Sequence, residues 1–157
     1  EYGAHLVPEG GLAMLPKLSM AGLLVTGDAA GLSVNNGFVV RGMDLAIASG
    51  MLAAQTVLEA RAKGDFGAEA MHRYVQLLEE SFVLKDMRTY AGAPAFMKNK
   101  RLYTAYPELL ARVMTAIYQH EGQPKAHLYT LALQSLKESG ISVLDVAKDG
   151  WKGARSL

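Results

Sequence analysis

The chain has 157 residues, with 16 Lys and Arg against 15 Asp and Glu, four His and no Cys. Half of its residues are hydrophobic and the formal charge is +1, which is typical of a globular protein and not of a nucleic-acid binder, so we expect no nucleic-acid partner. The missing cysteines exclude disulfides, thiolate nucleophiles and any iron–sulfur cluster held by this chain.

The N-terminal segment is predicted to hold a short strand over residues 2–7 and a turn over residues 8–11, because proline fixes φ and glycine accepts positive φ. Residues 22–27 form a short apolar run without alternation, which is typical of a parallel strand covered on both faces of a sheet. No second such strand follows it, so we expect its neighbours to come from sequence outside this chain or from another chain. The chain also opens at Glu1 with neither Met nor an apolar leader, and we therefore expect a fragment.

Most of the remaining sequence has helical periodicity. The predicted helices cover residues 40–62, 68–85, 106–120, 125–139 and 142–151. The predicted fold class is therefore an α/β fragment that is mostly helical.

The residues after the predicted strand carry the chemistry. Asp28 follows the strand directly, and ligands of open α/β sheets bind beyond the carboxyl ends of the strands. Gly27 and Ala29 leave room for close approach of a ligand, and the helix that begins near residue 40 offers free N–H groups. This arrangement suits a flavin cofactor. The Asp28 carboxylate can accept hydrogen bonds from the ribityl hydroxyls, and the N–H donors can stabilise the N1–C2=O edge of the reduced flavin. The alternative is an ordinary turn in which the aspartate caps the following backbone.

The helix after this segment is unusually rich in small residues, which is expected where another backbone or a planar ligand packs close to a helix. These are Gly42, Ala46, Ala48, Ser49, Gly50, Ala53 and Ala54.

These residues carry a resemblance to a known family. The relevant segments are Gly27-Asp28-Ala29-Ala30-Gly31, Asn35-Asn36-Gly37, Arg41-Gly42-Met43-Asp44 and Ala46-Ile47-Ala48-Ser49-Gly50. They resemble the second flavin-binding motif of FAD-dependent oxidoreductases, the group that includes aromatic hydroxylases and geranylgeranyl reductases. More narrowly, they are similar to the FixC branch, the electron transfer flavoprotein:quinone oxidoreductase family. Segments 5–11, 81–90 and 106–110 also resemble that branch.

The resemblance implies the C-terminal part of a two-domain flavoprotein with a Rossmann-like FAD-binding domain of the glutathione-reductase type. Residues 1–20 would end a substrate-domain strand and turn, residues 21–62 would finish the FAD-binding domain, and residues 63–157 would form a C-terminal helical region. The family's Gly-x-Gly-x-x-Gly loop, which binds the FAD pyrophosphate, is not in this sequence.

The resemblance also implies the site residues. The cofactor-binding residues carried over by position are Gly27, Asp28, Ala29, Asn35, Asn36 and Gly37. No residue of the chain is expected to act as a catalytic acid, base or nucleophile, because the flavin does the redox chemistry. The mitochondrial members hold a [4Fe–4S] cluster on cysteines, which this chain lacks, so a cluster would belong to a ferredoxin-like partner.

The function implied is an FAD-dependent oxidoreductase that passes electrons between electron transfer flavoprotein and a quinone or a ferredoxin-like protein. Its partners would include the remainder of its own flavoprotein chain, and we expect the chain by itself to be inactive. The expected location is the cytoplasm, including the inner face of the membrane. The alternatives are a geranylgeranyl-reductase-like enzyme that acts on a lipid, and a non-catalytic helical interaction module.

Several other polar side chains could have either a functional or a structural role. The four histidines lie far apart without metal-ligand spacing, so no metal site is expected. Arg41 could lie near the flavin or pair with Asp44 one turn later. Lys98, Lys100 and Arg101 could receive an acidic electron-transfer partner, although a solvated face is the default.

Overall fold

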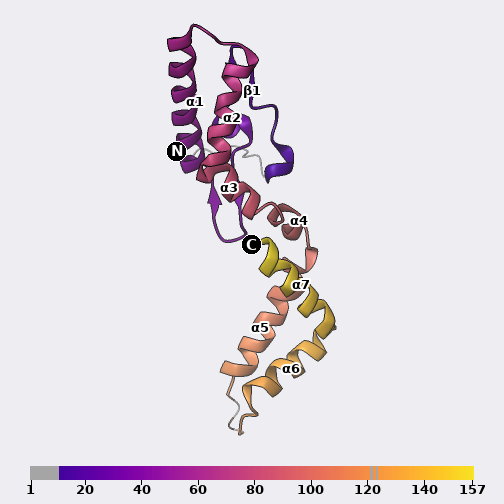
Figure 1. Cartoon of the computed structure of the whole chain (residues 1–157). Coiled ribbons are helices and arrows are strands. Elements are labelled where there is room, and N and C mark those ends of the chain that lie inside the picture. Colours follow the sequence, from indigo (N-terminus) through magenta and orange to yellow (C-terminus); the bar gives the residue numbers. More distant parts are fainter. Residues whose placement is uncertain (1–10, 121, 123) are drawn as a thin grey trace, which may run out of the picture. The chain divides into compact units, whose positions relative to one another are not determined.

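The structure is a computed structural model that describes residues 11–120, 122 and 124–157 (Figure 1). The described part is mostly helical, as predicted, and it divides into two compact units. The first holds the described residues up to Pro94 together with Ser156–Leu157, and the second is Ala95–Arg155. The strand predicted over residues 2–7 and the turn predicted over residues 8–11 lie outside the described residues except for Gly11, which begins a 3-10 helix.

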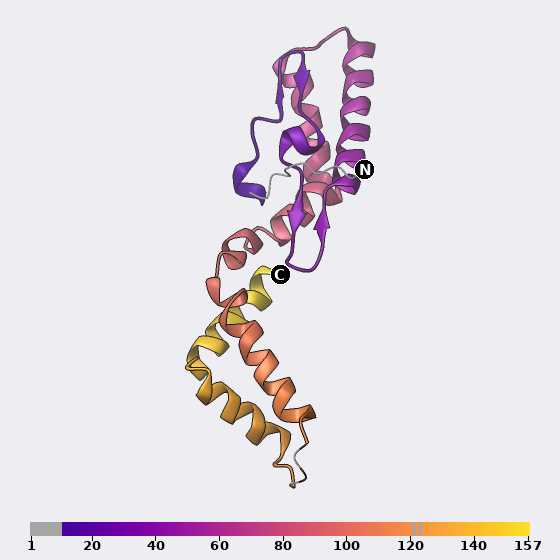
Figure 2. The same cartoon turned by 180° about the vertical axis from the view of Figure 1, so that it is seen from behind.

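The first unit begins with short elements and continues with three helices. In chain order these are η1 (Gly11–Met14), β1 (Ser19–Met20), β2 (Leu23–Leu24), η2 (Gly27–Ala30), β3 (Val34–Asn35), β4 (Val40–Arg41), α1 (Met43–Lys63), α2 (Ala68–Glu80) and α3 (Phe82–Thr89). Helix α1 packs alongside α2 (Figures 1 and 2). Its C-cap is Gly64, whose φ of 65° lies in the left-handed region, which residues with a Cβ rarely adopt.

The prediction of one helix over residues 68–85 is wrong near its C-terminal end. The helix breaks at Ser81, whose extended backbone ends α2 and begins α3. The Ser81 hydroxyl accepts a hydrogen bond from the Val83 amide at 3.1 Å, which is an ordinary N-cap. Sequence periodicity alone does not show this break because both helices keep apolar residues facing the same core.

The prediction of a buried parallel strand over residues 22–27 is also wrong for the part of the chain described. Strand β2 covers Leu23–Leu24 and pairs antiparallel with β1, with Ser19 opposite Leu24 and Met20 opposite Leu23. Leu23 is 47% exposed, so β2 is not covered on both faces. Gly22, at φ 71°, makes the turn between the two strands.

A second antiparallel pair joins β3 and β4 where the sequence predicts a loop and then the start of a helix. Helix α1 consequently begins at Met43, a few residues after the predicted start. A two-stranded pair this short gives little periodicity to detect in the sequence.

The core of the first unit is one hydrophobic cluster. It joins the segment around η2 to all three helices, and its buried members are Leu18, Ala30, Leu32, Val34, Leu45, Tyr74, Leu78, Val83, Leu84 and Met87. Helices α2 and α3 therefore share a core with the segment that carries the predicted site.

The second unit contains η3 (Lys100–Leu102), α5 (Ala105–Tyr118), α6 (Leu128–Glu138) and α7 (Val143–Ser156) up to Arg155, and α4 (Ala93–Met97) spans the division between the units. Helices α5 and α6 pack against each other. The three C-terminal helices confirm the helices predicted from periodicity, with ends that differ by a few residues. This agreement is expected because their patterns are long and amphipathic.

Candidate functional site

The Gly-Asp segment forms the 3-10 turn η2, which follows directly after Thr26 in extended conformation. Gly27 has φ 57° and Gly31 has φ 68°, both in the left-handed region that favours glycine. A Cβ at Gly27 would lie 3.3 Å from the Cβ of Ala46 on α1, whereas a Cβ at Gly31 would meet nothing within 4 Å. Gly27 and Ala46 are therefore both small because the turn lies directly against α1.

A buried hydroxyl fixes this contact. The Gly27 amide donates to Ser49 Oγ at 3.1 Å, and the Ser49 hydroxyl donates to the Ala46 carbonyl at 2.9 Å. Ser49 is fully buried, so without it the Gly27 amide would lose its acceptor in a place that water does not reach. In the sequence Ser49 stands out only as a small side chain, because its role as an acceptor depends on a contact 22 residues away in the chain.

Tyr74 of α2 holds the segment that enters the turn. Its hydroxyl donates to the Val25 carbonyl at 3.1 Å, and the side chain is fully buried. Burial raises the pKa of Tyr74 to about 12, an effect that a hydrogen bond with Ser49 opposes. Tyr74 could not be identified from the sequence, because nothing local distinguishes it from other tyrosines on amphipathic helices.

Asp28 lies on the exposed side of η2, close to the start of α1. Its Oδ1 atom lies 3.7 Å from the position that a Cβ at Gly42 would take, and Gly42 immediately precedes α1. The structure thus brings Asp28 to the N-terminal end of a 21-residue helix, as the sequence analysis expected. Ala29 is the next residue of the same turn and is also exposed.

Asn35 ends β3, and Asn36 and Gly37 follow it in the turn between β3 and β4. Asn35 Oδ1 accepts from the Gly37 amide at 2.9 Å, and Asn36 Oδ1 accepts from the amides of Phe38 and Val39 at 3.1 and 2.9 Å. Gly37 has φ 84°. Both amide oxygens therefore shape their own turn, which gives these two asparagines a structural role in addition to the predicted one.

Arg41 pairs with two carboxylates in the first unit, which supports the pairing reading of this residue. Its Nε donates to Asp44 Oδ2 at 2.9 Å and its Nη1 to Asp86 Oδ2 of α3 at 2.7 Å. The hydrogen bond to Asp44, followed by the one to Asp86, raises the pKa of Arg41, and Arg41 lowers the pKa of Asp44. The contact with Asp86 links the end of the β3–β4 pair to α3.

Helix α1 has an apolar face without a partner among the described residues. Met43, Ile47 and Met51 follow one another at four-residue spacing and are 84%, 66% and 69% exposed. Leu58 continues the face, and Phe38 before the helix is 87% exposed. A helix that is apolar on its outer side as well as on its core side is typical of the interior of a larger protein.

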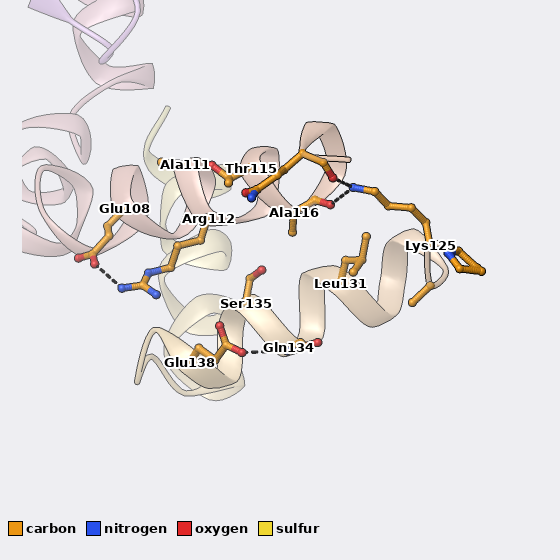
Figure 3. Close-up of a pocket in the computed structure, with 13 residues that line it drawn as sticks. Glu108, Ala111, Arg112, Thr115, Ala116, Lys125, Leu131, Gln134, Ser135 and Glu138 are labelled. Atoms are coloured by element: carbon orange, nitrogen blue, oxygen red, sulfur yellow. Dashed lines mark hydrogen bonds and ion pairs between the residues drawn. The ribbon is translucent and has the colours of Figure 1, made fainter. Parts of the chain in front are cut away.

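The second unit has a hollow of its own. An open groove of about 840 Å³ runs between α5 and α6, and Figure 3 shows Arg112 beside Glu108 at one end and Lys125 at the other. Arg112 Nη2 lies 2.8 Å from Glu108 Oε1, and Lys125 Nζ donates to the Ala116 and Ile117 carbonyls at the end of α5. The groove contains none of the six predicted cofactor residues, and its charged groups serve the helices that line it.

Arg101 belongs to an internal cluster of the second unit. Its Nε and Nη2 lie 2.7 and 3.1 Å from the two oxygens of Asp149, and Tyr106 donates to Asp149 Oδ2 at 2.7 Å. The guanidinium of Arg101, with Tyr106 and Asn99, holds the pKa of Asp149 well below its usual range. Three basic residues were predicted as a surface for an acidic partner. Arg101 therefore has a structural role within the second unit, while Lys98 and Lys100 are exposed.

Comparison with known proteins gives the same family as the motif residues. Residues 93–157 match the ETF-QO/FixC family C-terminal domain. The whole chain is 44% identical to the probable electron transfer flavoprotein-quinone oxidoreductase YdiS of Escherichia coli and 41% identical to protein FixC of Salmonella typhimurium. The chain is similar along its whole length to proteins of the ETF-QO/FixC family. It spans 36% of the length of these two relatives.

The matched domain begins at residue 93, close to the division between the two compact units. Protein FixC of Azotobacter vinelandii is 40% identical over 127 residues, which is 80% of this chain and 29% of that protein. Among the described helices, none combines the length and apolar character that crossing a membrane requires.

Proposed function

We propose that this chain supplies the ribityl-binding part of an FAD-dependent oxidoreductase that passes electrons between electron transfer flavoprotein and a quinone or ferredoxin-like partner. The single observation that supports this most is the placement of Asp28 beside Gly42 at the start of α1. An acceptor for sugar hydroxyls and the donor end of a helix then face the same small region.

The residues present fit an FAD. Gly42 leaves the space beside the Asp28 carboxylate unfilled, because a Cβ at Gly42 would stand 3.7 Å from Asp28 Oδ1. In the proposed site Asp28 accepts hydrogen bonds from the ribityl hydroxyls, and the amides of Gly27 and Gly31 fix the turn that carries it. FAD supplies the redox chemistry when bound; the protein contributes binding, orientation and electrostatics.

The chain's own residues make Asp28 rigid. Ser49 holds the Gly27 amide, and Tyr74 holds the Val25 carbonyl just before the turn. A carboxylate on a turn whose preceding backbone is held by α1 and α2 binds with a smaller loss of conformational freedom than one on a loose loop. A helical interaction module has no need for this arrangement.

The proposed electron transfer flavoprotein and quinone partners are supported by the name of one relative, and the ferredoxin-like partner by the resemblance of the motif residues. YdiS is named as a probable electron transfer flavoprotein-quinone oxidoreductase, and this favours electron transfer over a reductase that acts on a lipid. The partner that would cover the apolar face of α1 is the remainder of the flavoprotein. The proposed location is the cytoplasm, including the inner face of the membrane.

The test is the absorption spectrum of the full-length protein with Asp28→Ala. We expect the flavin bands of the wild-type protein to be lost or strongly reduced in this variant. Glu69→Ala is the matched control, since Glu69 is an exposed carboxylate at the start of α2, and it should keep full flavin occupancy. Full occupancy in Asp28→Ala would remove Asp28 from the site.

For the 157-residue chain alone we propose weak or no flavin binding and no activity, because the pyrophosphate loop of the family is not in this sequence. Equilibrium dialysis against FAD measures this directly. A stoichiometric yellow complex of the chain alone would contradict the proposal.

A further inference from the structure

Helix α1 begins without a capping side chain at the point where it meets Asp28. Its N-cap is Gly42, which has no side chain to accept from the amides of the first turn, and the Ala46 amide donates to the Gly42 carbonyl at 2.8 Å. A side chain at this position would occupy the space beside Asp28, because its Cβ would lie 3.7 Å from Oδ1. The end of α1 that faces Asp28 is therefore held by contacts other than a cap.

Arg41, the residue before Gly42, supplies such contacts. Its Nε donates to Asp44 Oδ2 in the first turn of α1 at 2.9 Å, and its Nη2 donates to the same oxygen. Its Nη1 donates to Asp86 Oδ2 of α3 at 2.7 Å. Arg41 and Asp86 are 45 residues apart in the chain, so this bond joins two elements of the fold. The planar fork of a guanidinium suits such a bridge between two carboxylates.

The α3 side of this bridge is itself fixed by the core. Val83, Leu84 and Met87 of α3 are buried in the hydrophobic cluster that also contains Leu45 of α1. The side chain of Asp86 is 31% exposed and that of Arg41 is 33% exposed. Water screens a pair that is partly buried less than one on the open surface, so this pair can hold α1 and α3 in one register.

We propose that Arg41 is a positioning residue of the proposed FAD site. By joining Asp44 to Asp86 it fixes the first turn of α1 relative to α3, and this keeps the open space at Gly42 beside Asp28. Each of the three guanidinium nitrogens already donates to a carboxylate, so Arg41 acts through the helix and not as a cofactor ligand. The inference rests on the proposed function, because its effect is exerted on the Asp28 site.

The experiment is a fluorescence titration that gives the FAD dissociation constant of the full-length protein with Arg41→Gln and, separately, with Asp86→Asn. We expect each variant to bind FAD roughly threefold to tenfold more weakly than wild type, the range usual for coupling within one ion-pair network. The double variant should bind no more weakly than Arg41→Gln, since both changes break the same bridge. Asp86→Asn leaves the pair of Arg41 with Asp44 intact and still tests the bridge if Arg41→Gln does not fold.

Arg88→Gln is the matched control. Arg88 Nη2 lies 2.9 Å from Glu79 Oε1, so this pair also joins two helices of the first unit, α3 and α2, but it does not involve α1. We expect Arg88→Gln to keep the wild-type dissociation constant, with urea unfolding used to choose conditions in which all variants are folded. A loss of affinity as large as that of Arg41→Gln would overturn the inference.

A second comparison separates a role at the Asp28 site from a general role in the fold. If Arg41 acts by keeping the start of α1 beside Asp28, Arg41→Gln should weaken FAD binding less in an Asp28→Asn background than in wild type. An equal loss in both backgrounds would overturn the inference. A loss with Asp28→Asn but none with Arg41→Gln or Asp86→Asn would contradict only this inference, whereas wild-type binding by Asp28→Asn would contradict the proposed function and this inference together.

Discussion

The first unit buries a hydrophobic cluster around Tyr74 and Leu78, whereas α5 of the second unit contains no buried residue and α6 buries only Ser135. In the second unit the described contacts include a polar cluster in which Asp149 joins Arg101 and Tyr106. The first unit is thus arranged to hold a turn in place. The second keeps a charged cluster inside, whereas exposed apolar side chains occur in both units, on α1 in the first and on α7 in the second.

The difference also explains what each unit can contribute to function. Asp28 belongs to a turn that is tied to the core by Ser49 and by Ala30, which is fully buried. In the second unit the charged groups of the open groove are paired within the unit. A positioned cofactor ligand is therefore expected in the first unit, and an interaction surface in the second.

The largest expected effect comes from comparing one leucine in each unit. Leu78 is fully buried, and Leu78→Ala should lower the free energy of unfolding by about 3 kcal/mol because it leaves a cavity in the core. Leu133 is 57% exposed, and Leu133→Ala should change the free energy of unfolding by less than about 0.5 kcal/mol. Urea unfolding measures both, and similar losses for the two variants would break the comparison.

A smaller effect is expected from the hydroxyl that fixes the Gly-Asp turn. Ser49→Ala should cost about 2 kcal/mol, since it leaves the buried Gly27 amide without an acceptor. The control is Thr56→Val on the same helix, because the Thr56 hydroxyl is also fully buried but only donates to the Leu52 carbonyl at 2.9 Å. We expect less than about 1 kcal/mol for Thr56→Val.

Thermal or urea unfolding of the two hydroxyl variants distinguishes these cases. Equal losses would show that Ser49 acts only by filling space. A loss confined to Ser49→Ala would sharpen the contrast between a hydroxyl that holds the turn and one that serves its own helix.

The pH dependence of stability should differ between the units. Arg101, then Tyr106 and Asn99, lower the pKa of Asp149, so this stabilisation of the second unit is present above the unfolded pKa near ~4 and is lost as pH falls. Burial raises the pKa of Tyr74 to about 12, so its contribution to the first unit is complete below pH ~10 and is lost as pH rises toward 12. Between these pH values the free energy of unfolding of the first unit should fall by up to about 1.4 kcal/mol per pH unit.

Pepsin digestion below pH 4 measures the acid loss of stability in the second unit. Urea unfolding at alkaline pH measures the alkaline loss in the first unit. Acid should expose cleavage sites in α6 and α7 before those in α2, and Asp149→Asn should remove this acid sensitivity. Tyr74→Phe should flatten the alkaline limb. First cleavage in α2 at low pH, or an alkaline limb unchanged in Tyr74→Phe, would contradict these assignments.

Much of the helical part of the fold could be predicted from the sequence. The C-terminal helices α5 to α7 have strong amphipathic patterns, and periodicity located them. The strands could not be placed, because β1 to β4 cover two residues each and their pairing depends on turns at Gly22 and Gly37. The break at Ser81 could not be predicted either, because an N-cap serine inside a continuous helical pattern resembles any other polar residue of a helix.

The candidate site could be predicted only in part. Asp28 stands out because it follows an apolar run between small residues, and the structure puts it beside the start of α1. The contacts that hold it, from Ser49 and Tyr74, join segments 22 and 49 residues apart and leave no local signal. Asn35 and Asn36 were predicted as cofactor residues, and their oxygens also shape their own turn.

The most direct test of the central claim is the FAD dissociation constant of the full-length protein with Asp28→Asn. This change keeps the size of the side chain but removes its charge, and Glu69→Gln is the control for loss of one exposed carboxylate. We predict that Asp28→Asn weakens FAD binding by about tenfold or more, because hydrogen bonds to a charged group contribute about 1.5–3 kcal/mol. A dissociation constant equal to that of wild type and of Glu69→Gln would contradict the account.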